Sequence, residues 1–404
     1  MAKDARASLQ VGQLLRVKIE KIAHGGHFIA RHEGAVIFVR HGIPDEEVIV
    51  EVTSIGSSFN RGDVVEVLTP SPDRVSAPCT YAKRDGCGGC DFQHISLPRQ
   101  RELKGDVIKE QFARIAKMEI DVEVEEVSAP LGWRTRFNAV TTRNGALGFY
   151  ASRSHKVIPI DDCRVLVRDA NYPELSKKRW KGDARVEVSI SNVGERTIAI
   201  GGAREDGPAE LIEGPEVAHY KVGSKTLEVS QRSFWQSNEA APKILTRAVL
   251  EQLAPKSDER FLDLYGGVGL FTSAIIAALG EDAQIDLVEG SKSATADASR
   301  NFSLNENVKI HTGDVARILP RFTSADVIIL DPPREGAGRE VVEQMVALKP
   351  RAILYIACDP AALARDASYL IDKGYDMHAL RSYDLFPMTH HIESVALFEP
   401  HKVS

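Results

Sequence analysis

The sequence predicts an α/β fold in which a doubly wound sheet of seven strands is preceded by a small β-barrel and a mainly β central domain. Three observations lead to this prediction. From residue 260 onward, apolar strand-like segments alternate with helical ones, which is the pattern of βαβ units around a parallel sheet. A glycine-rich turn follows the first of these strands. Residues 10–69 instead alternate with period two between turn residues, which is typical of short strands.

With 404 residues the chain is long for one domain, so two or three are expected. We place the barrel at residues 1–70, the central domain at 71–232 and the doubly wound domain at 233–404, with a helix at 98–117 that can pack on the last of these. No apolar run approaches the ~20 residues of a membrane span, and residues 1–15 lack a signal-peptide core. We therefore expect a cytoplasmic monomer without membrane contact.

The first domain contains four or five strand-like segments, among them residues 14–19, 36–39, 48–52 and 64–68. So many short strands in about sixty residues predict a closed barrel. Gly26, the strand at 34–39 and Pro44 before an acidic pair make this segment resemble the TRAM module, an OB-like barrel that binds RNA. The resemblance implies an RNA partner.

Cysteines open the central domain. Cys87 and Cys90 are separated by two glycines, which let both thiolates turn towards one centre, and Cys79 lies shortly before them. Cys163 is the natural fourth ligand besides Cys358. Four thiolates suit either Zn²⁺ or a [4Fe-4S] cluster, and the spacing leaves both open. Unmetallated buried cysteines are the alternative, whereas an odd total of five argues against a disulfide framework.

A basic stretch follows within the same domain. Residues 131–160 contain no acidic residue, although the chain as a whole has a net charge of −6. Aromatic residues lie among the basic ones, so the stretch predicts a surface that contacts RNA phosphates; a solvated sheet face is the alternative. The basic residues are Arg134, Arg136, Arg143, Arg153 and Lys156.

The third domain opens with the segment Phe261-Leu-Asp-Leu-Tyr-Gly-Gly-Val-Gly269, a buried strand that enters a turn of glycines. Glycine is needed where the backbone turns sharply against a ligand. The next apolar strand ends in Glu289, which is placed to bind ribose hydroxyls. The pattern predicts a nucleoside-bearing cofactor, and S-adenosylmethionine fits better than NAD because the complete G-x-G-x-x-G is absent. A glycine-rich turn without a ligand is the alternative.

Two later strands end in residues suited to chemistry. Strand 327–330 ends in Asp331-Pro-Pro-Arg334, and an acid with two prolines at this place forms a stiff wall beside a flipped base in methyltransferases that act on bases. Strand 352–357 ends in Cys358, at the edge of the sheet where a nucleophile would lie; a small buried apolar residue is the alternative. The residue after the two prolines is Arg334. An aromatic residue there would indicate methylation of an exocyclic amine, and a Cys would indicate methylation of cytosine C5, so Arg334 argues against both reactions.

Taken in order, Gln236, Asp331-Pro-Pro-Arg334, Ala357-Cys-Asp-Pro360 and His391-Ile-Glu-Ser-Val395 resemble the RNA uracil-C5 methyltransferase family over nearly the whole chain, and most of all its 23S rRNA members. The resemblance implies a class I, Rossmann-like methyltransferase domain, S-adenosylmethionine as methyl donor, and a [4Fe-4S] cluster on Cys79, Cys87, Cys90 and Cys163. The chain departs from the family at Gly266, where members commonly have Cys, at Leu270, and in the longer gap between Cys79 and Cys87.

The resemblance also implies residue roles. Cys358 would add to uracil C6 as nucleophile, Glu393 would remove the C5 proton, and Asp331 would border both cofactor and uracil. Phe234 would stack on the base. The implied cofactor-binding residues are Gln236, Tyr265, Gly267, Gly269, Glu289, Asp314 and Asp331, and the RNA-binding residues are Phe234, Arg134, Arg136, Arg143, Arg153 and Arg334.

Three alternatives to a 23S rRNA enzyme are a tRNA uridine-C5 methyltransferase, an RNA cytosine-C5 methyltransferase, and an RNA-binding iron–sulfur protein with a dead transferase site. The last is disfavoured because Cys358, Glu393, Asp331 and Gln236 are all intact.

Overall fold

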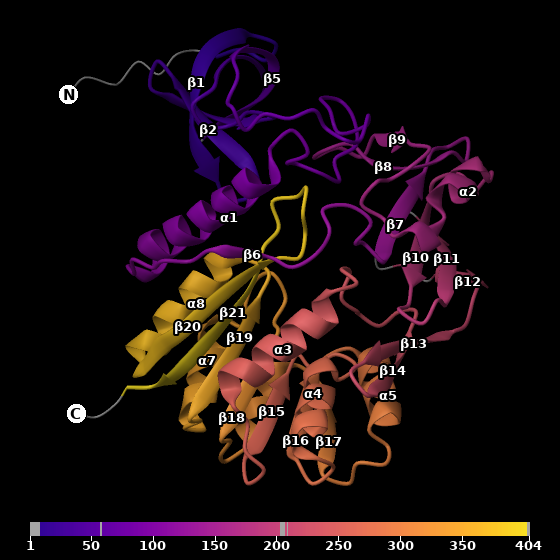
Figure 1. Ribbon diagram of the computed structural model, residues 1–404, viewed down its shortest axis with the longest axis vertical. Helices are drawn as coiled ribbons and strands as arrows, with labels where there is room; N and C mark the ends of the chain where they lie inside the picture. The colour runs from indigo at the N-terminus through magenta and orange to yellow at the C-terminus, as the bar shows by residue number, and fades with distance from the viewer. Residues whose placement is uncertain (1–8, 57–58, 203–206, 208, 402–404) are drawn as a thin grey trace.

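The computed structural model describes residues 9–56, 59–202, 207 and 209–401 (Figure 1). A barrel lies at the top of Figure 1, a six-stranded sheet at the right, and an eight-stranded sheet with flanking helices below. Within the described ranges, no helix is long and apolar enough to cross a membrane. Residues 1–8, which belong to the stretch without an expected signal-peptide core, lie outside the described residues.

The barrel is closed by five strands in the order β1-β2-β3-β5-β4, which confirms the predicted barrel. Successive side chains of a strand point to opposite faces, so that one face of each strand points into the barrel. In β1, Leu15, Val17 and Ile19 are buried while the residues between them are exposed. The strands are β1 (Leu14–Ala23), β2 (His27–His32), β3 (Ala35–Arg40), β4 (Glu47–Ile55) and β5 (Asn60–Thr69).

The central segment forms an antiparallel sheet in the order β12-β11-β10-β7-β8-β9. Its core contains the buried side chains of Phe137, Val186 and Ile198 from the strands, and of Tyr172 and Leu175 from a short helix. The elements are β7 (Arg136–Thr141), β8 (Leu147–Tyr150), β9 (Val157–Pro159), η2 (Arg168–Ala170), α2 (Tyr172–Lys177), β10 (Ala184–Ile190), β11 (Arg196–Gly202) and β12 (Ala209–Glu213).

The large sheet has the order β17-β16-β15-β18-β19-β21-β20-β6, one strand more than the seven expected. Its first five strands are parallel, and β21 runs antiparallel between β19 and β20. The additional strand is β6 (Val124–Glu126), which pairs in parallel with β20 and is too short to show a period in the sequence. The other strands are β15 (Arg260–Leu264), β16 (Gln284–Glu289), β17 (Val308–Thr312), β18 (Val327–Leu330), β19 (Ala352–Ala357), β20 (Tyr375–Asp384) and β21 (Glu393–Pro400).

Helices cover both faces of this sheet, because successive strand residues bury alternately on one face and the other. Leu262 and Leu264 pack with α7 and α8, while Phe261 packs with α3 and α4. The hairpin β13 (Val217–Val222) and β14 (Lys225–Ser230) adds Tyr220 and Leu227 to the second face. The helices are α3 (Ala241–Leu253), α4 (Leu270–Leu279), α5 (Lys292–Asn301), α6 (Val315–Ile318), η3 (Leu319–Arg321), α7 (Gly338–Ala347) and α8 (Pro360–Asp372).

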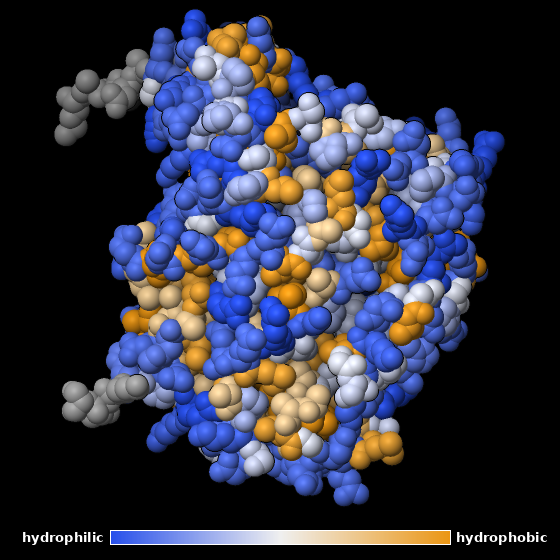
Figure 2. Space-filling view, viewed as in Figure 1, coloured by the Kyte–Doolittle hydropathy of each residue, from blue (hydrophilic) through white to orange (hydrophobic). Residues whose placement is uncertain are grey.

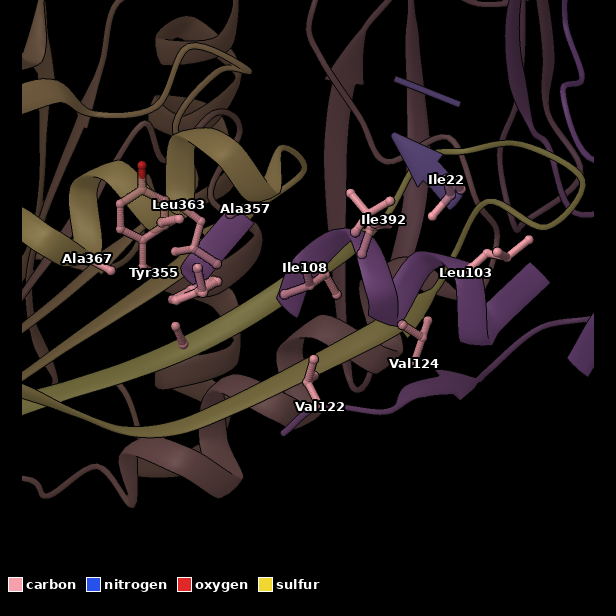
Figure 3. Packing of buried hydrophobic residues seen from close by; sticks show 14 of the residues in the cluster. Ile22, Leu103, Ile108, Val122, Val124, Tyr355, Ala357, Leu363, Ala367 and Ile392 are labelled. Atoms are coloured by element: carbon pink, nitrogen blue, oxygen red, sulfur yellow. The ribbon is translucent and has the colours of Figure 1, made fainter. Parts of the chain in front are cut away.

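One apolar core joins the barrel to the large sheet. The helix α1 (Leu97–Gln111), which continues as the π-helical turn η1 (Phe112–Ala116), lies between them. Figure 3 shows Ile22 of the barrel near Leu103 of α1 and Ile392 of the loop before β21, all in this core. Strand β6 and the β13–β14 hairpin precede residue 233, yet they pack with the large sheet. The large sheet thus includes residues from outside the predicted third domain. The domain boundaries at 70 and 232 stay predictions.

Candidate active site

The candidate active site lies at the carboxyl edge of the parallel strands, where ligands bind in open α/β sheets. Asp331 follows β18 and Cys358 follows β19, while Glu393 begins the antiparallel strand β21. Ala357 pairs with Ser394, so the next residues outward on these adjacent strands are Cys358 and Glu393. The fold therefore brings together three residues that are far apart in the sequence.

The surroundings of Cys358 keep its thiol protonated in the resting protein. Burial first, and then the negative charges of Glu393 and Asp331, raise the pKa of this thiol to about 12. The guanidinium of Arg334 opposes them. Because the thiolate is the nucleophilic form, the thiol must lose its proton before it can attack.

Buried acids surround this thiol. Glu393 is 4% exposed, and burial, followed by the charge of Asp331, raises its pKa well above the usual range. Burial and the charge of Asp263 raise the pKa of Asp331 to about 7. In the part of the chain that the structure describes, none of these three acids forms a salt bridge with a basic side chain. Such a group of acids favours a positively charged ligand, whose charge would stabilise their ionised forms.

Asp263 was not a candidate from the sequence. Its Oδ2 accepts hydrogen bonds from Thr272 N (3.0 Å) and Thr272 Oγ1 (2.6 Å), while its Oδ1 is buried without a hydrogen-bond partner among the described residues. Burial raises its pKa to about 6. An acidic residue in the middle of the apolar strand β15 was the signal that could have found it.

The segment between β14 and α3 contributes a buried amide and an exposed ring. Gln236 is 7% exposed, and its Nε2 donates to Asp331 Oδ2 at 3.5 Å. Phe234, two residues earlier, is 66% exposed between the buried side chains of Ser233 and Trp235. The exposure of Phe234 leaves its ring free, and its stacking on a base stays a prediction.

The glycine-rich turn after β15 has left-handed backbone at Tyr265 (φ 57°), Gly267 (φ 56°) and Gly269 (φ 97°). The two oxygens of Glu289 accept hydrogen bonds from Gly267 N (3.0 Å) and Ser291 N (2.6 Å). This acid is thus aimed at the turn, and each oxygen keeps a second lone pair for a ribose hydroxyl.

Asp314 lies nearby, where it caps α6 by accepting a hydrogen bond from Arg317 N at 3.2 Å. Burial raises the pKa of Tyr265 to about 12, and the charge of Asp314 adds to the effect. The structure therefore gathers Tyr265, Gly267, Glu289 and Asp314 at the ends of β15, β16 and β17.

The four cysteines of the central domain line one cavity of about 260 Å³. All four are free thiols that are partly buried, and burial raises the pKa of Cys90 and of Cys163 to about 12. Gly89 N donates to Cys87 Sγ at 3.4 Å. In the described ranges, no three His, Cys, Asp or Glu side chains are arranged to hold a metal ion. The four thiols thus share one cavity without forming a metal site among the described residues.

The arginines of residues 131–160 differ in their surroundings. Arg134 lines the cysteine cavity, and its Nε donates to the carbonyl of Arg136 (3.0 Å). Arg136 donates to the carbonyls of Ser233 (2.9 Å) and Gln231 (3.2 Å), so it holds the segment before Phe234. Arg143 and Arg153 are exposed elsewhere. Phosphate binding by the four stays a prediction.

Residues 217–401 match the family model for tRNA (Uracil-5-)-methyltransferase, and residues 8–65 match the TRAM domain. An RNA methyltransferase of Streptomyces avermitilis is 39% identical over 428 residues, 96% of this chain and 99% of that one. The 23S rRNA (uracil(1939)-C(5))-methyltransferase RlmD of Shewanella amazonensis is 31% identical over 436 residues, 96% of both chains. The crystal structure of Pyrococcus abyssi tRNA (uracil-54, C5)-methyltransferase with S-adenosyl-L-homocysteine has a TM-score of 0.73 at 22% identity, and the match covers 95% of this chain and 99% of that one.

The fold and the site thus define an RNA methyltransferase built on a class I α/β sheet. The chain belongs to the RNA uracil-C5 methyltransferase family and carries a TRAM domain at its N-terminal end. The family and the enzyme class predicted from the motifs are confirmed.

Proposed function

We propose that this enzyme transfers a methyl group from S-adenosylmethionine to C5 of a uridine in structured RNA through a covalent adduct on Cys358. The observation that carries the proposal is the register of β19 and β21, which sets Cys358 beside Glu393, with Asp331 at the next strand end. Uracil C5 is too weak a nucleophile to be methylated directly, so a nucleophile and a base must work on the same ring.

Each residue has one step. The Cys358 thiolate adds to C6, and the electron pair of the C5–C6 double bond makes C5 nucleophilic. After C5 gains its methyl group, the Glu393 carboxylate takes the C5 proton, and the bond between C6 and Sγ breaks as the double bond forms again. The raised pKa of Glu393 makes its carboxylate a stronger base, which suits removal of a proton from carbon.

S-adenosylmethionine would supply the methyl group from its sulfonium centre. The residues that fit it are those around the glycine turn: Glu289 for the ribose, Asp314 and Tyr265 beside it, and Gln236 near Asp331. The buried carboxyl groups of Asp331 and Asp263 favour the positive charges of its sulfonium and ammonium groups.

The cysteine cavity supports a [4Fe-4S] cluster held by Cys79, Cys87, Cys90 and Cys163 in a structural role. Four thiolates can also hold one Zn²⁺, so the metal content of the protein decides between the two. Protein purified without air should be brown and hold about four irons per chain. A Cys163→Ser variant should lose most of the iron, and one zinc per chain without visible absorbance would contradict the cluster.

An open groove of about 900 Å³ next to the site supports RNA binding. Phe234 and the exposed Arg232 line it together with Arg134, Arg136 and Arg185. An aromatic platform within a basic groove is the usual device for binding single-stranded RNA. Arg334 lines the same cavity as Cys358, and its positive charge acts on that thiol.

Two substitutions test the mechanism by where each one stops the reaction. Cys358→Ala should neither transfer methyl groups nor form a covalent RNA adduct. Glu393→Gln keeps the nucleophile but lacks the base, so it should methylate once and remain attached to the RNA on a denaturing gel. Normal turnover by Glu393→Gln, or an adduct with Cys358→Ala, would overturn these roles. An inactive wild type that still binds RNA would indicate a dead transferase.

For the target we propose 23S rRNA, supported by the similarity to the Shewanella enzyme across both whole chains. The tRNA alternative is supported by the name of the matching family model. Unmodified 23S rRNA and tRNA, each offered with labelled methyl donor, would separate them, and the appearance of 5-methylcytidine would indicate cytosine chemistry. We also propose that the enzyme acts in the cytoplasm and as a monomer.

A further inference from the structure

The turn between β1 and β2 of the barrel lies against the loop that carries Cys358. His24, Gly25 and Gly26 of this turn line the same cavity of about 170 Å³ as Cys358 and Asp359. His24 Nε2 lies 2.9 Å from Asp359 Oδ2, although the two residues are 335 positions apart in the sequence. The RNA-binding module therefore touches the residue next to the nucleophile.

Asp359 uses its two oxygens for two different elements. Oδ1 accepts hydrogen bonds from Ala361 N (3.0 Å) and Ala362 N (2.9 Å), which caps the first turn of α8. Oδ2 is left for His24. Since Asp359 follows Cys358 directly, a rotation of its backbone would displace the thiol as well.

The other side of the same turn is also confined. A Cβ atom on Gly26, whose φ is 78°, would lie 2.7 Å from His390 Cβ, so the turn packs directly on the loop that leads to Glu393. His390 Nδ1 is in turn 2.6 Å from Asp91 Oδ2. The segment that follows Cys358 and the loop that precedes Glu393 thus both rest on one turn of the barrel.

We propose that His24 is a positioning residue for the nucleophile: by holding Asp359, it fixes the Cys358 loop against the barrel. This inference rests on the proposed role of Cys358. The side chains of His24 and Asp359 are 40% and 24% exposed, so their contact contributes little to global stability. The effect of removing it should therefore fall on the rate of adduct formation, and not on folding.

The test compares full-length variants in single-turnover reactions with RNA and methyl donor at saturating concentrations. His24→Leu removes the N–H donor, and the rate of adduct formation should fall about 10- to 100-fold, as expected when a reacting group is misplaced. His24→Gln retains an N–H that can reach Asp359, so it should restore most of the rate. His32→Leu is the matched control, because His32 lies at the end of β2 without a hydrogen-bond or ionic partner among the described residues.

Two further measurements, the Kd for RNA and the Tm, decide between explanations. The Kd for RNA and the Tm of His24→Leu should equal those of the wild type. An unchanged rate overturns the inference, and so does a weaker Kd with an unchanged maximal rate, which would make His24 an RNA contact. A lower Tm without rescue by His24→Gln overturns it too, since the role would be structural only. If the wild type itself forms no adduct, the proposed function fails and the inference falls with it.

Discussion

Single residues at the carboxyl edge of the sheet are acidic where a folded core would ordinarily be apolar. Asp263, Asp331 and Glu393 all have raised pKa values, with burial as the first cause. Buried acids without basic partners cost stability when they ionise. The protein tolerates this cost where a cationic methyl donor would offset it, so stability and pH should be linked at these positions.

Asp331→Asn should reveal that link. The pKa of Asp331 is about 7 in the folded protein and near 4 when exposed, so the unfolded chain releases its proton first as the pH rises. Stability therefore falls between about pH 4 and 7 in the wild type. The Asn variant avoids this loss and should be more stable at pH 8 by about 1 kcal/mol or more, with no difference at pH 4.

Urea denaturation at both pH values measures this difference. Asp282→Asn serves as control, because Asp282 is exposed far from the site and should show no such pH dependence. An equal gain from Asp331→Asn at both pH values would point to packing instead of ionisation.

The glycine turn offers a second residue-scale prediction. A Cβ at Gly269 would lie 2.1 Å from the ring of Phe302, at a φ of 97°, whereas a Cβ at Gly267 would meet nothing within 4 Å at a φ of 56°. Gly269→Ala should thus destabilise by about 2–4 kcal/mol through clash and strain, and Gly267→Ala by about 1 kcal/mol through strain alone. Equal Tm values for the two variants would contradict this.

Sequence reasoning placed Asp331 and Cys358 together because the ends of parallel strands lie at one edge of a sheet whatever the loop lengths. Glu393, which begins the antiparallel strand β21, came from the family resemblance instead. It could not place Arg134 and Arg136, since a count of charges along the chain does not say which side chains turn inward to bind backbone carbonyls. It also missed Asp263, whose burial depends on packing from α4.

At the scale of elements, α1 braces the loop that leads to Glu393. Lys104 is 1% exposed, and its Nζ donates to Asp384 Oδ1 (2.6 Å) and to the carbonyl of Phe386 (3.1 Å). One turn earlier, Gln100 Oε1 accepts a hydrogen bond from Met388 N (2.9 Å). Helix α1 therefore holds the segment from Asp384 to Met388 that leads to Glu393.

Lys104→Met should destabilise the protein by about 3–5 kcal/mol, because it leaves the Asp384 carboxylate buried without its partner. The double variant Lys104→Met/Asp384→Leu removes both charges and should recover most of that loss. Chemical denaturation of the wild type and both variants measures the coupling. A double variant no more stable than the single one would show that Lys104 acts through its packing and not through the ion pair.

The long elements were predictable and the short ones were not. The apolar strands of the large sheet and the strands of the barrel have clear periods, whereas β6 has three residues and takes its place from the edge of β20. Likewise, nothing local in the β13–β14 hairpin says that Tyr220 packs against Trp235 in the core of the large sheet.

On the scale of the whole molecule, the surface and the core have different organisation. Figure 2 shows a mainly hydrophilic face on which hydrophobic residues form separate small groups. Inside, one core runs from the barrel through α1 to the large sheet, while the central sheet has a core of its own. The sequence predicted three consecutive domains and a helix at 98–117 that can pack on the last of them. It could not predict that the barrel joins the same core, because that contact is between distant segments.

The shared core predicts that barrel and large sheet unfold together. Ile22 is 3% exposed, and Ile22→Ala should cost about 2–5 kcal/mol. Because its neighbours include α1 and the loop before β21, amide protection should fall equally in β1–β3 and in β19 and α8 when measured by hydrogen exchange and mass spectrometry. Ile198→Ala, at a fully buried position of the central sheet, should lower protection in β10 and β11 and leave the barrel unchanged. If Ile22→Ala weakened only the barrel, the barrel would be an independent unit, and its turn at His24 could not hold the nucleophile's loop in a fixed position.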